Sequence, residues 1–252
     1  MRVLLDVHPE IRCGEETGIV ISMLEVVASY LIAPDWNENA NFSVIKHDFV
    51  KPVLEDVASG ITRELIRKHS PEETVLCNKD PMSLVHISVL HEMFPKAKFI
   101  VMVRDGRGTL HSLITKYHEY RWNFILDNTR NLTMSELEHN FKVWNYLIGI
   151  MIKQCVNIGP ELCMIVHYER LVQSTAEELE RIMNFIGVSL AENQLEHEKH
   201  LENVQMNWGQ ISQDQVINKV YTKGTHVWAN FYPPELMSKL SEIAPMLEVL
   251  GM

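Results

Sequence analysis

A basic residue stands directly after the most apolar run of the chain. Residues 98–103, Lys-Phe-Ile-Val-Met-Val, have the continuous apolar character of a buried parallel strand, and Arg104 follows at its carboxyl end. Ligands of open α/β sheets bind beyond that end, where the N-terminus of the next helix also favours anions. Ser112 is predicted to lie about two turns along that helix and could donate its hydroxyl to the same anion. A local ion pair between Arg104 and Asp105, with Ser112 merely exposed, is the structural alternative.

Two further places carry groups that could take part in a transfer reaction. Lys79 follows the short apolar run 74–77 and is a compact, mobile cation suited to a phosphoryl or sulfuryl group in transfer. Glu15 and Glu16 lie in a loop containing Gly14, where a carboxylate could act as a general base toward a hydroxyl. Taken alone, Lys79 and the glutamates are more simply interpreted as solvated surface charges. The 12 histidines show no ligand spacing, so no metal is predicted.

Alternating strands and helices must position these groups. Asp80 and Pro81 mark the start of one helix, and Ser174-x-x-Glu177 is a predicted capping box. Strands separated by helices indicate a parallel sheet with right-handed crossovers, and therefore an α/β fold in one domain, residues 1–252. The polar segment 190–231 lacks clear periodicity. The pattern predicts strands at 74–77, 98–103 and 162–166, and helices at 1–9, 18–33, 50–68, 81–94, 106–118, 135–154, 174–186 and 233–250, the last broken before Pro245.

The overall composition is that of an ordinary folded domain. Of 252 residues, 46% are hydrophobic and 22% are charged, which excludes disordered and collagen-like classes. The 23 Lys and Arg against 33 Asp and Glu give a net charge of −10, which argues against a nucleic-acid-coating surface. No run of eighteen apolar residues and no secretory leader occurs. The first predicted helix has no capping residue, so we expect part of the fold to lie upstream of Met1.

Composition alone leaves the compartment open. The cysteines Cys13, Cys77, Cys155 and Cys163 have no zinc-like spacing, and reduced, buried thiols are the favoured interpretation at this stage. Two glycosylation sequons begin at Asn41 and Asn131 and would be usable only in a secretory compartment.

Several short blocks occur in an order and spacing that one family shares. The most specific are Cys-Gly-Glu-Glu-Thr at 13–17 and Cys-Asn-Lys-Asp-Pro at 77–81, accompanied by blocks at 1–9, 94–99, 102–107, 111–112, 166–169 and 212–217. On these blocks the chain resembles the protein-tyrosine sulfotransferases, Golgi enzymes that transfer a sulfuryl group from 3′-phosphoadenosine 5′-phosphosulfate to tyrosines of secreted and membrane proteins. The resemblance implies their P-loop-like sulfotransferase fold, with a central parallel sheet flanked by helices, and their activity.

The resemblance also implies roles for individual residues. Glu16 matches the base that takes the tyrosine proton, and Lys79 and Ser212 match the pair that stabilises charge during transfer. Arg104 and Ser112 match the groups that hold the donor's 3′-phosphate. Further cofactor contacts are implied for Lys116 and Tyr168, and for the loop Ser212, Gln213, Asp214, Gln215, Val216, Ile217, Asn218, Lys219, Val220 and Tyr221. Substrate contacts are implied for Gly18, Ile19, Val20, Ile21 and Ser22.

The cysteines change meaning in the light of the resemblance. It implies disulfides Cys13–Cys77 and Cys155–Cys163, which reverses the expectation of reduced thiols. It also implies a homodimeric glycoprotein of the Golgi lumen or membrane that acts on tyrosine-containing, acidic protein substrates. The donor leaves as adenosine 3′,5′-bisphosphate. The resemblance implies no metal cofactor and no nucleic-acid partner.

Departures from the family pattern define an alternative. The chain starts just after the position of the family's 5′-phosphosulfate loop, and its first strand and membrane anchor precede that loop. Gly18, Ser22 and Val227 stand where family members carry basic residues, and Asn218-Lys219 replaces a Lys-Pro pair. The favoured hypothesis is an enzyme whose recorded sequence starts at an internal methionine. A non-catalytic, lumenal binding protein is the alternative.

Overall fold

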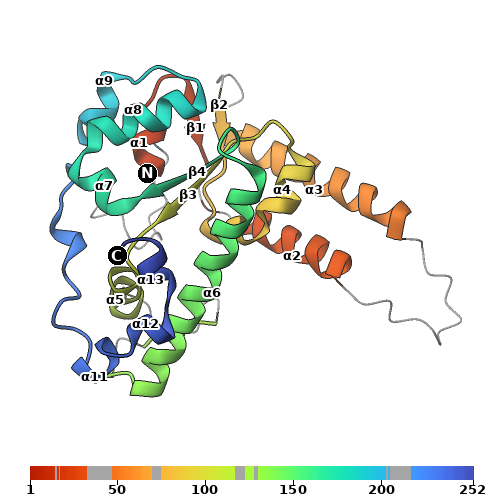
Figure 1. The fold of residues 1–252 in the computed structure, drawn as a ribbon. Helices are drawn as coiled ribbons and strands as arrows, with labels where there is room; N and C mark the ends of the chain where they lie inside the picture. The colour runs from red at the N-terminus through yellow and green to blue at the C-terminus, as the bar shows by residue number, and fades with distance from the viewer. Residues whose placement is uncertain are drawn as a thin grey trace, which may run out of the picture. The chain divides into compact units, whose positions relative to one another are not determined.

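The structure is a computed structural model, and it contains two pairs of parallel strands (Figure 1). β1 (Ile11–Cys13) pairs with β2 (Val75–Cys77), and β3 (Phe99–Val103) pairs with β4 (Cys163–His167). The structure describes residues 1–14, 16, 18–32, 47–69, 75–116, 123–127, 130–202, 204 and 217–252. Parallel strands joined through helices confirm the predicted α/β class.

Each strand pair belongs to a different compact unit. The first unit comprises Met1–Ala97 with Ala191–Ile217, and the second comprises Lys98–Leu190 with Asn218–Met252. No helix among the described residues combines the length and apolarity needed to cross a membrane.

The first unit contains the helices α1 (Arg2–Asp6), α2 (Ile19–Ile32), α3 (His47–His69), η1 (Pro81–His86), α4 (Ile87–Met93), α9 (Glu192–Leu195) and η2 (His197–Lys199). In this unit, α1 packs against β1, and α3 packs against both strands. In the described residues, Val3 and Val7 pack with Val204 in a small apolar cluster. The buried carboxylate of Asp6 accepts a 2.5 Å hydrogen bond from the Cys13 amide, which ties α1 to β1.

The second unit has a larger core along α6. Its helices are α5 (Gly106–Lys116), α6 (Met134–Ile158), α7 (Tyr168–Gln173), α8 (Thr175–Ile186), η3 (Lys223–Thr225), α11 (Pro234–Met237), α12 (Leu240–Ile243) and α13 (Met246–Val249). Phe141 and Trp144 of α6 pack against Leu110 of α5 and against Leu236 and Leu240 of the C-terminal helices. Gly106 is required where α5 meets α6, because a Cβ there would lie 2.8 Å from the Trp144 ring.

Several sequence expectations need correction. The predicted strands do not include β1, and the helix expected over 81–94 is a 3-10 turn, η1, followed by the α-helix α4. The predicted capping box at Ser174 is wrong, because Ser174 also ends α7 and its side chain makes no capping hydrogen bond. A capping box is present at the start of α6, where Thr133 and Glu136 bind each other reciprocally. The C-terminal helix expected over 233–250 is divided into α11, α12 and α13.

Candidate active site

A disulfide joins the carboxyl ends of β1 and β2. Cys13 and Cys77 are directly opposite each other in the strand register, with Cα atoms 4.5 Å apart. The second implied bond, Cys155–Cys163, joins the end of α6 to the start of β4 with Cα atoms 5.3 Å apart. Both pairings are confirmed, and the composition-based expectation of reduced thiols is wrong.

Glu16 and Lys79 meet beyond these strand ends. The Lys79 Nζ lies 2.5 Å from the Glu16 Oε2, and the side chains are 40% and 20% exposed, respectively. The two residues are 63 positions apart in the sequence, and the adjacent strands bring them together. Their interpretation as separate solvated charges is therefore wrong. A carboxylate that can accept a proton and a mobile cation thus share one place, as a group-transfer site requires.

Asp80 fixes the turn that carries Lys79. Its buried side chain accepts a 3.3 Å hydrogen bond from the Met82 amide, and Pro81 occupies the first turn of η1. This confirms the predicted cap. Burial raises the pKa of the Asp80 carboxyl, and the negative charge of Glu16 raises it further. The turn therefore adds a second carboxylate near the ion pair, in a conformation set by its own backbone hydrogen bonds.

The segment implied to bind substrate begins α2 in the first unit. Gly18 has a φ of +69°, in the left-handed region that favours glycine, and its carbonyl accepts a 2.9 Å hydrogen bond from the Ser22 hydroxyl. Val20 and Ile21 are only 1% and 9% exposed, so they pack in the interior. Of the five residues, Gly18, Ile19 and Ser22 reach the surface and can contact a substrate directly.

Arg104 is held in the second unit by a carbonyl and an aromatic ring. Its Nη2 donates a 2.7 Å hydrogen bond to the Gly224 carbonyl, and its guanidinium lies 4.7 Å from the centre of the Tyr168 ring. The Nε is buried and has no hydrogen-bond acceptor among the described residues. The expected alternative of a pair with Asp105 is wrong, because Arg107 binds both carboxylate oxygens of Asp105.

The other predicted anion-binding residues lie along α5 or beside Arg104. Ser112 is partly buried near the middle of α5, and Lys116 is its last residue, about 15 Å from Gly106 at 1.5 Å per residue. His111 lies within electrostatic reach of Arg104, since burial and then the Arg104 charge lower the pKa of its imidazole. Burial raises the pKa of Tyr168, so its hydroxyl remains neutral at physiological pH.

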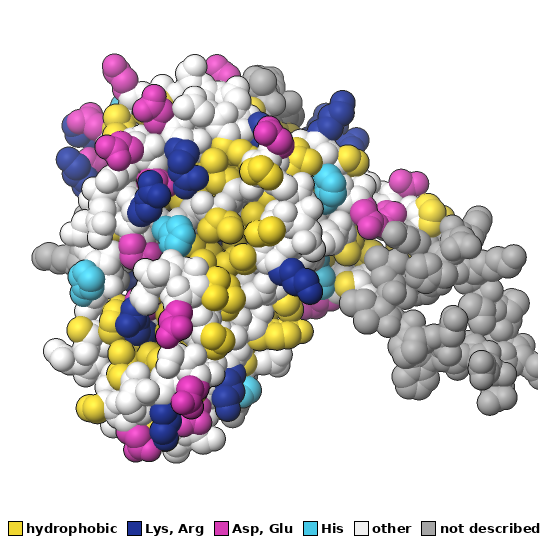
Figure 2. Space-filling model, viewed as in Figure 1, with side chains coloured by type: hydrophobic (Ala, Val, Ile, Leu, Met, Phe, Trp, Pro, Cys, Tyr) yellow, Lys and Arg dark blue, Asp and Glu magenta, His cyan; other side chains and the backbone are white. Residues whose placement is uncertain are grey.

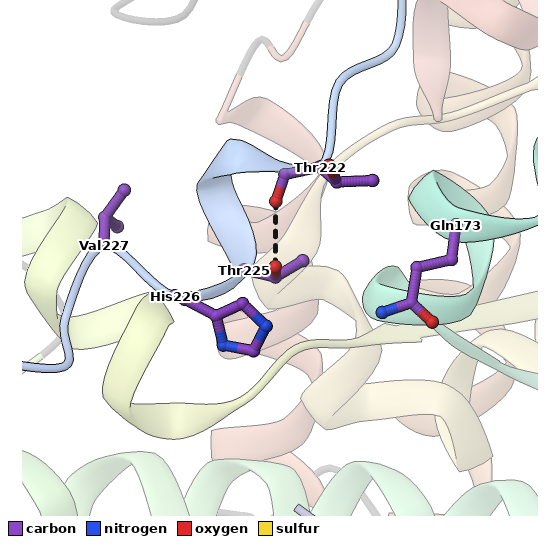
Figure 3. A pocket seen from close by; sticks show the side chains of 5 residues that line it. All are labelled: Gln173, Thr222, Thr225, His226 and Val227. Atoms are coloured by element: carbon purple, nitrogen blue, oxygen red, sulfur yellow. Dashed lines mark hydrogen bonds between the residues drawn. The ribbon is translucent and has the colours of Figure 1, made fainter.

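A hollow of about 530 Å³ lies beside η3 (Figure 3). Its lining mixes polar and apolar groups and consists of Gln173, Thr222, Thr225, His226 and Val227. The Thr225 hydroxyl donates a 2.8 Å hydrogen bond to the Thr222 carbonyl, which closes the turn. Gln173 reaches the hollow from α7, whereas His226 reaches it from the segment that follows η3 (Figure 3). No local sequence pattern predicts the hollow, and the resemblance draws attention only to Val227, which stands where family members carry a lysine.

The implied cofactor loop is only partly within the described residues. Ser212, Gln213, Asp214, Gln215 and Val216 lie outside them. Ile217, Asn218, Lys219 and Tyr221 are exposed, and Val220 is partly buried. Tyr221 is close enough to Tyr168 for its charge, if ionised, to raise the pKa of that phenol, which places the loop end near the Arg104 cluster.

Two solved structures with this fold are sulfotransferase domains. The chain matches a sulfotransferase domain from the curacin biosynthetic pathway with a TM-score of 0.61 at 14% identity, covering 98% of this chain and 92% of that chain. It also matches a sulfotransferase domain from the Synechococcus PCC 7002 olefin synthase with a TM-score of 0.58 at 16% identity, covering 98% and 88%. These similarities confirm the predicted sulfotransferase-type fold.

Sequence comparison narrows the class. The profile of the sulfotransferase family matches residues 1–192. Over its whole length the chain is 33% identical to the protein-tyrosine sulfotransferase of Drosophila melanogaster and 33% identical to protein-tyrosine sulfotransferase 2 of Gallus gallus. A Caenorhabditis elegans relative is also 33% identical, and the chain covers 90% of its length. The chain belongs to the protein-tyrosine sulfotransferase family. It spans 48% of the length of the fruit-fly relative and 65% of the chicken relative.

Proposed function

We propose that the protein is a protein-tyrosine sulfotransferase, which transfers a sulfuryl group from 3′-phosphoadenosine 5′-phosphosulfate to tyrosine hydroxyls of secretory-pathway proteins. The observation that carries this proposal is the contact between Glu16 and Lys79 beyond the linked ends of β1 and β2. A non-catalytic relative would have no need to keep a carboxylate and a cation in one place. The non-catalytic alternative is therefore not favoured.

In the proposed mechanism Glu16 is the general base. Its carboxylate accepts the proton of the tyrosine hydroxyl, and the disulfide between the strand ends holds it in register with Lys79. The bound donor supplies the sulfuryl group that the tyrosine oxygen receives. Lys79 stabilises negative charge on oxygen as that charge develops, because a cation on a flexible stem can follow it. Ser212 is proposed as its hydrogen-bonding partner.

Arg104 and its neighbours have the properties of a phosphate site. In the described part of the chain no carboxylate neutralises Arg104, and its buried Nε lacks an acceptor. An anion would supply that acceptor, so the residues fit the 3′-phosphate of the donor. We assign that phosphate to Arg104 and Ser112, and further donor contacts to Lys116, Tyr168 and the segment Ser212–Tyr221.

The proposed partners and compartment follow from the family and the disulfides. We propose acidic, tyrosine-containing substrates, a homodimer and a Golgi location. Two disulfides that pair all four cysteines support an oxidising compartment, since such bonds persist there. On the face shown in Figure 2, acidic and basic side chains are interspersed, so attraction of acidic substrates relies on local cations and not on the net charge.

Replacement of Glu16 by Gln in the full-length protein tests the function. Loss of a general base lowers kcat by about 10²- to 10⁴-fold, whereas binding of adenosine 3′,5′-bisphosphate should not change. The measurements are transfer of labelled sulfate to an acidic tyrosine peptide and calorimetric binding of the bisphosphate. The matched control is Glu10→Gln, at an exposed carboxylate of the same unit. Wild-type protein that sulfates no tyrosine peptide would refute the function, and a fully active Glu16→Gln variant would refute only the assigned base.

A further inference from the structure

A segment of the second unit is fastened across the start of α5. We call this segment, Thr222–Tyr232, the strap. The Arg107 guanidinium lies 4.1 Å from the centre of the Trp228 ring. The Tyr232 hydroxyl donates a 2.7 Å hydrogen bond to the Arg107 carbonyl. The Phe231 ring packs edge-on against His111 with ring centres 4.7 Å apart. These contacts fix the strap at positions beyond its hydrogen bond with Arg104.

Gly224 is the point at which the strap approaches Arg104 and Tyr168. A Cβ at this position would lie 3.8 Å from the Arg104 Nη2 and 2.9 Å from the Tyr168 hydroxyl oxygen. The second distance is shorter than the contacts that Cβ atoms make in proteins. The φ of Gly224 lies outside the left-handed region, so its backbone conformation suits any residue. Glycine is therefore required by the space beneath the strap and not by backbone geometry.

The consequence concerns the orientation of the arginine. The Gly224 carbonyl binds one edge of the guanidinium while the Tyr168 ring supports its face. A planar guanidinium held on an edge and a face has little rotational freedom left, so binding an anion costs less ordering. A Cβ at 224 would push aside either the Gly224 carbonyl or the Tyr168 hydroxyl, and would thereby disturb one of the two supports of the arginine.

We propose that Gly224 is a positioning residue for Arg104 and thereby sets the preference of the protein for nucleotides that carry a 3′-phosphate. This inference rests on the proposed function, in which Arg104 holds that phosphate. Gly224 itself contacts no reacting group and acts through the arginine. Because the 3′-phosphate distinguishes the donor from ordinary adenine nucleotides, the strap acts as a specificity element.

The test compares two ligands in the full-length protein. Calorimetry gives the Kd of adenosine 3′,5′-bisphosphate and the Kd of adenosine 5′-monophosphate. The Kd of the monophosphate divided by the Kd of the bisphosphate measures how much the 3′-phosphate contributes to affinity. Gly224→Ala should lower this ratio by about tenfold or more, the effect of one misplaced charge-assisted hydrogen bond, with the monophosphate affinity unchanged. The control is Gly149→Ala on α6, where an added Cβ meets only Met246 at an ordinary 3.9 Å.

A second variant tests the steric cause. Tyr168→Phe removes the hydroxyl that the new Cβ would meet and keeps the ring that supports Arg104. Gly224→Ala should therefore have little effect on the ratio when it is introduced into the Tyr168→Phe protein, and the difference between the two backgrounds is the coupling energy.

Each outcome has one meaning. An unchanged ratio in Gly224→Ala would overturn the positioning role. An equal loss in both backgrounds would overturn the steric argument, and with it the proposed role of glycine. A wild-type protein with no preference for the bisphosphate would instead refute the phosphate assignment of Arg104 in the proposed function.

Discussion

Removal of the disulfide between Cys13 and Cys77 is expected to destabilise the first unit selectively. Replacing both residues by Ala opens a loop with a sequence separation of 64, against only 8 for Cys155 and Cys163. Since the entropy of loop closure grows with the logarithm of loop length, the first bond contributes about 4 kcal/mol and the second about 2.5 kcal/mol. Each bond lies within one unit, so each loss is expected in that unit.

The assay must read the two units separately. Guanidinium unfolding followed by pulsed hydrogen exchange and mass spectrometry gives a midpoint for peptides of β1 and β2, and another for peptides of β3 and β4. The double variant Cys13→Ala/Cys77→Ala should lower the first midpoint much more than the second. The matched control, Cys155→Ala/Cys163→Ala, should show the smaller loss in the second unit.

The same variant carries a prediction for activity. Glu16 and Lys79 lie three and two residues beyond the linked cysteines, so the bond maintains their 2.5 Å contact. Loss of the bond should reduce kcat although neither residue is changed, because small displacements of catalytic groups are costly. Equal destabilisation of both units, or full activity with the predicted loss of stability, would refute the reasoning.

Two further predictions concern single side chains. The pKa of His111 is lowered in the folded protein, so the unfolded chain takes up this proton first as the pH falls through about 6.5, and stability decreases below that pH. Urea unfolding at a series of pH values gives the free energy of unfolding as a function of pH. This free energy should depend less steeply on pH in His111→Gln than in wild type, and an equal dependence would contradict the prediction. If the chain passes through the secretory pathway, the exposed Asn131 should carry a glycan. Peptide N-glycosidase should remove one glycan fewer from Asn131→Gln than from wild type or from Thr133→Ser, which keeps both the sequon and the helix cap. Wild-type protein of unmodified mass would disprove glycosylation at this position.

Long or chemically distinctive local patterns correctly predicted elements that carry the site. The apolar run ending at Val103 predicted β3, and the position of Arg104 at its end followed directly. Asp80 with Pro81 correctly predicted the start of η1. By contrast, β1 has only three residues, and Arg12 interrupts its apolar pattern, so pairing with β2 defines it as a strand.

Long-range contacts explain what local patterns missed. The cysteine pairs and the meeting of Glu16 with Lys79 were expected only through the family resemblance, because strand pairing brings these residues together. The hydrogen bond between Arg104 and the Gly224 carbonyl joins residues 120 positions apart. Its acceptor is a backbone atom, so the residue type at position 224 does not predict it. Ser174 does not cap α8 with its side chain, and it is the one residue between α7 and α8. The pattern Ser174-x-x-Glu177 does not show that a helix precedes it.

The discontinuity of the first unit affects the order in which the protein acquires its structure during synthesis. The buried Gln194 donates a 2.8 Å hydrogen bond to the Leu4 carbonyl from 190 positions later in the chain, and Asn193 donates another, of 3.1 Å, to Val7. At about 5 to 20 residues per second, these partners leave the ribosome roughly 10 to 40 s after α1. Cys155 and Cys163 emerge almost together and can pair before that. The amino-terminal helix is therefore among the last elements to complete its native contacts, although it is the first of the described elements to be made.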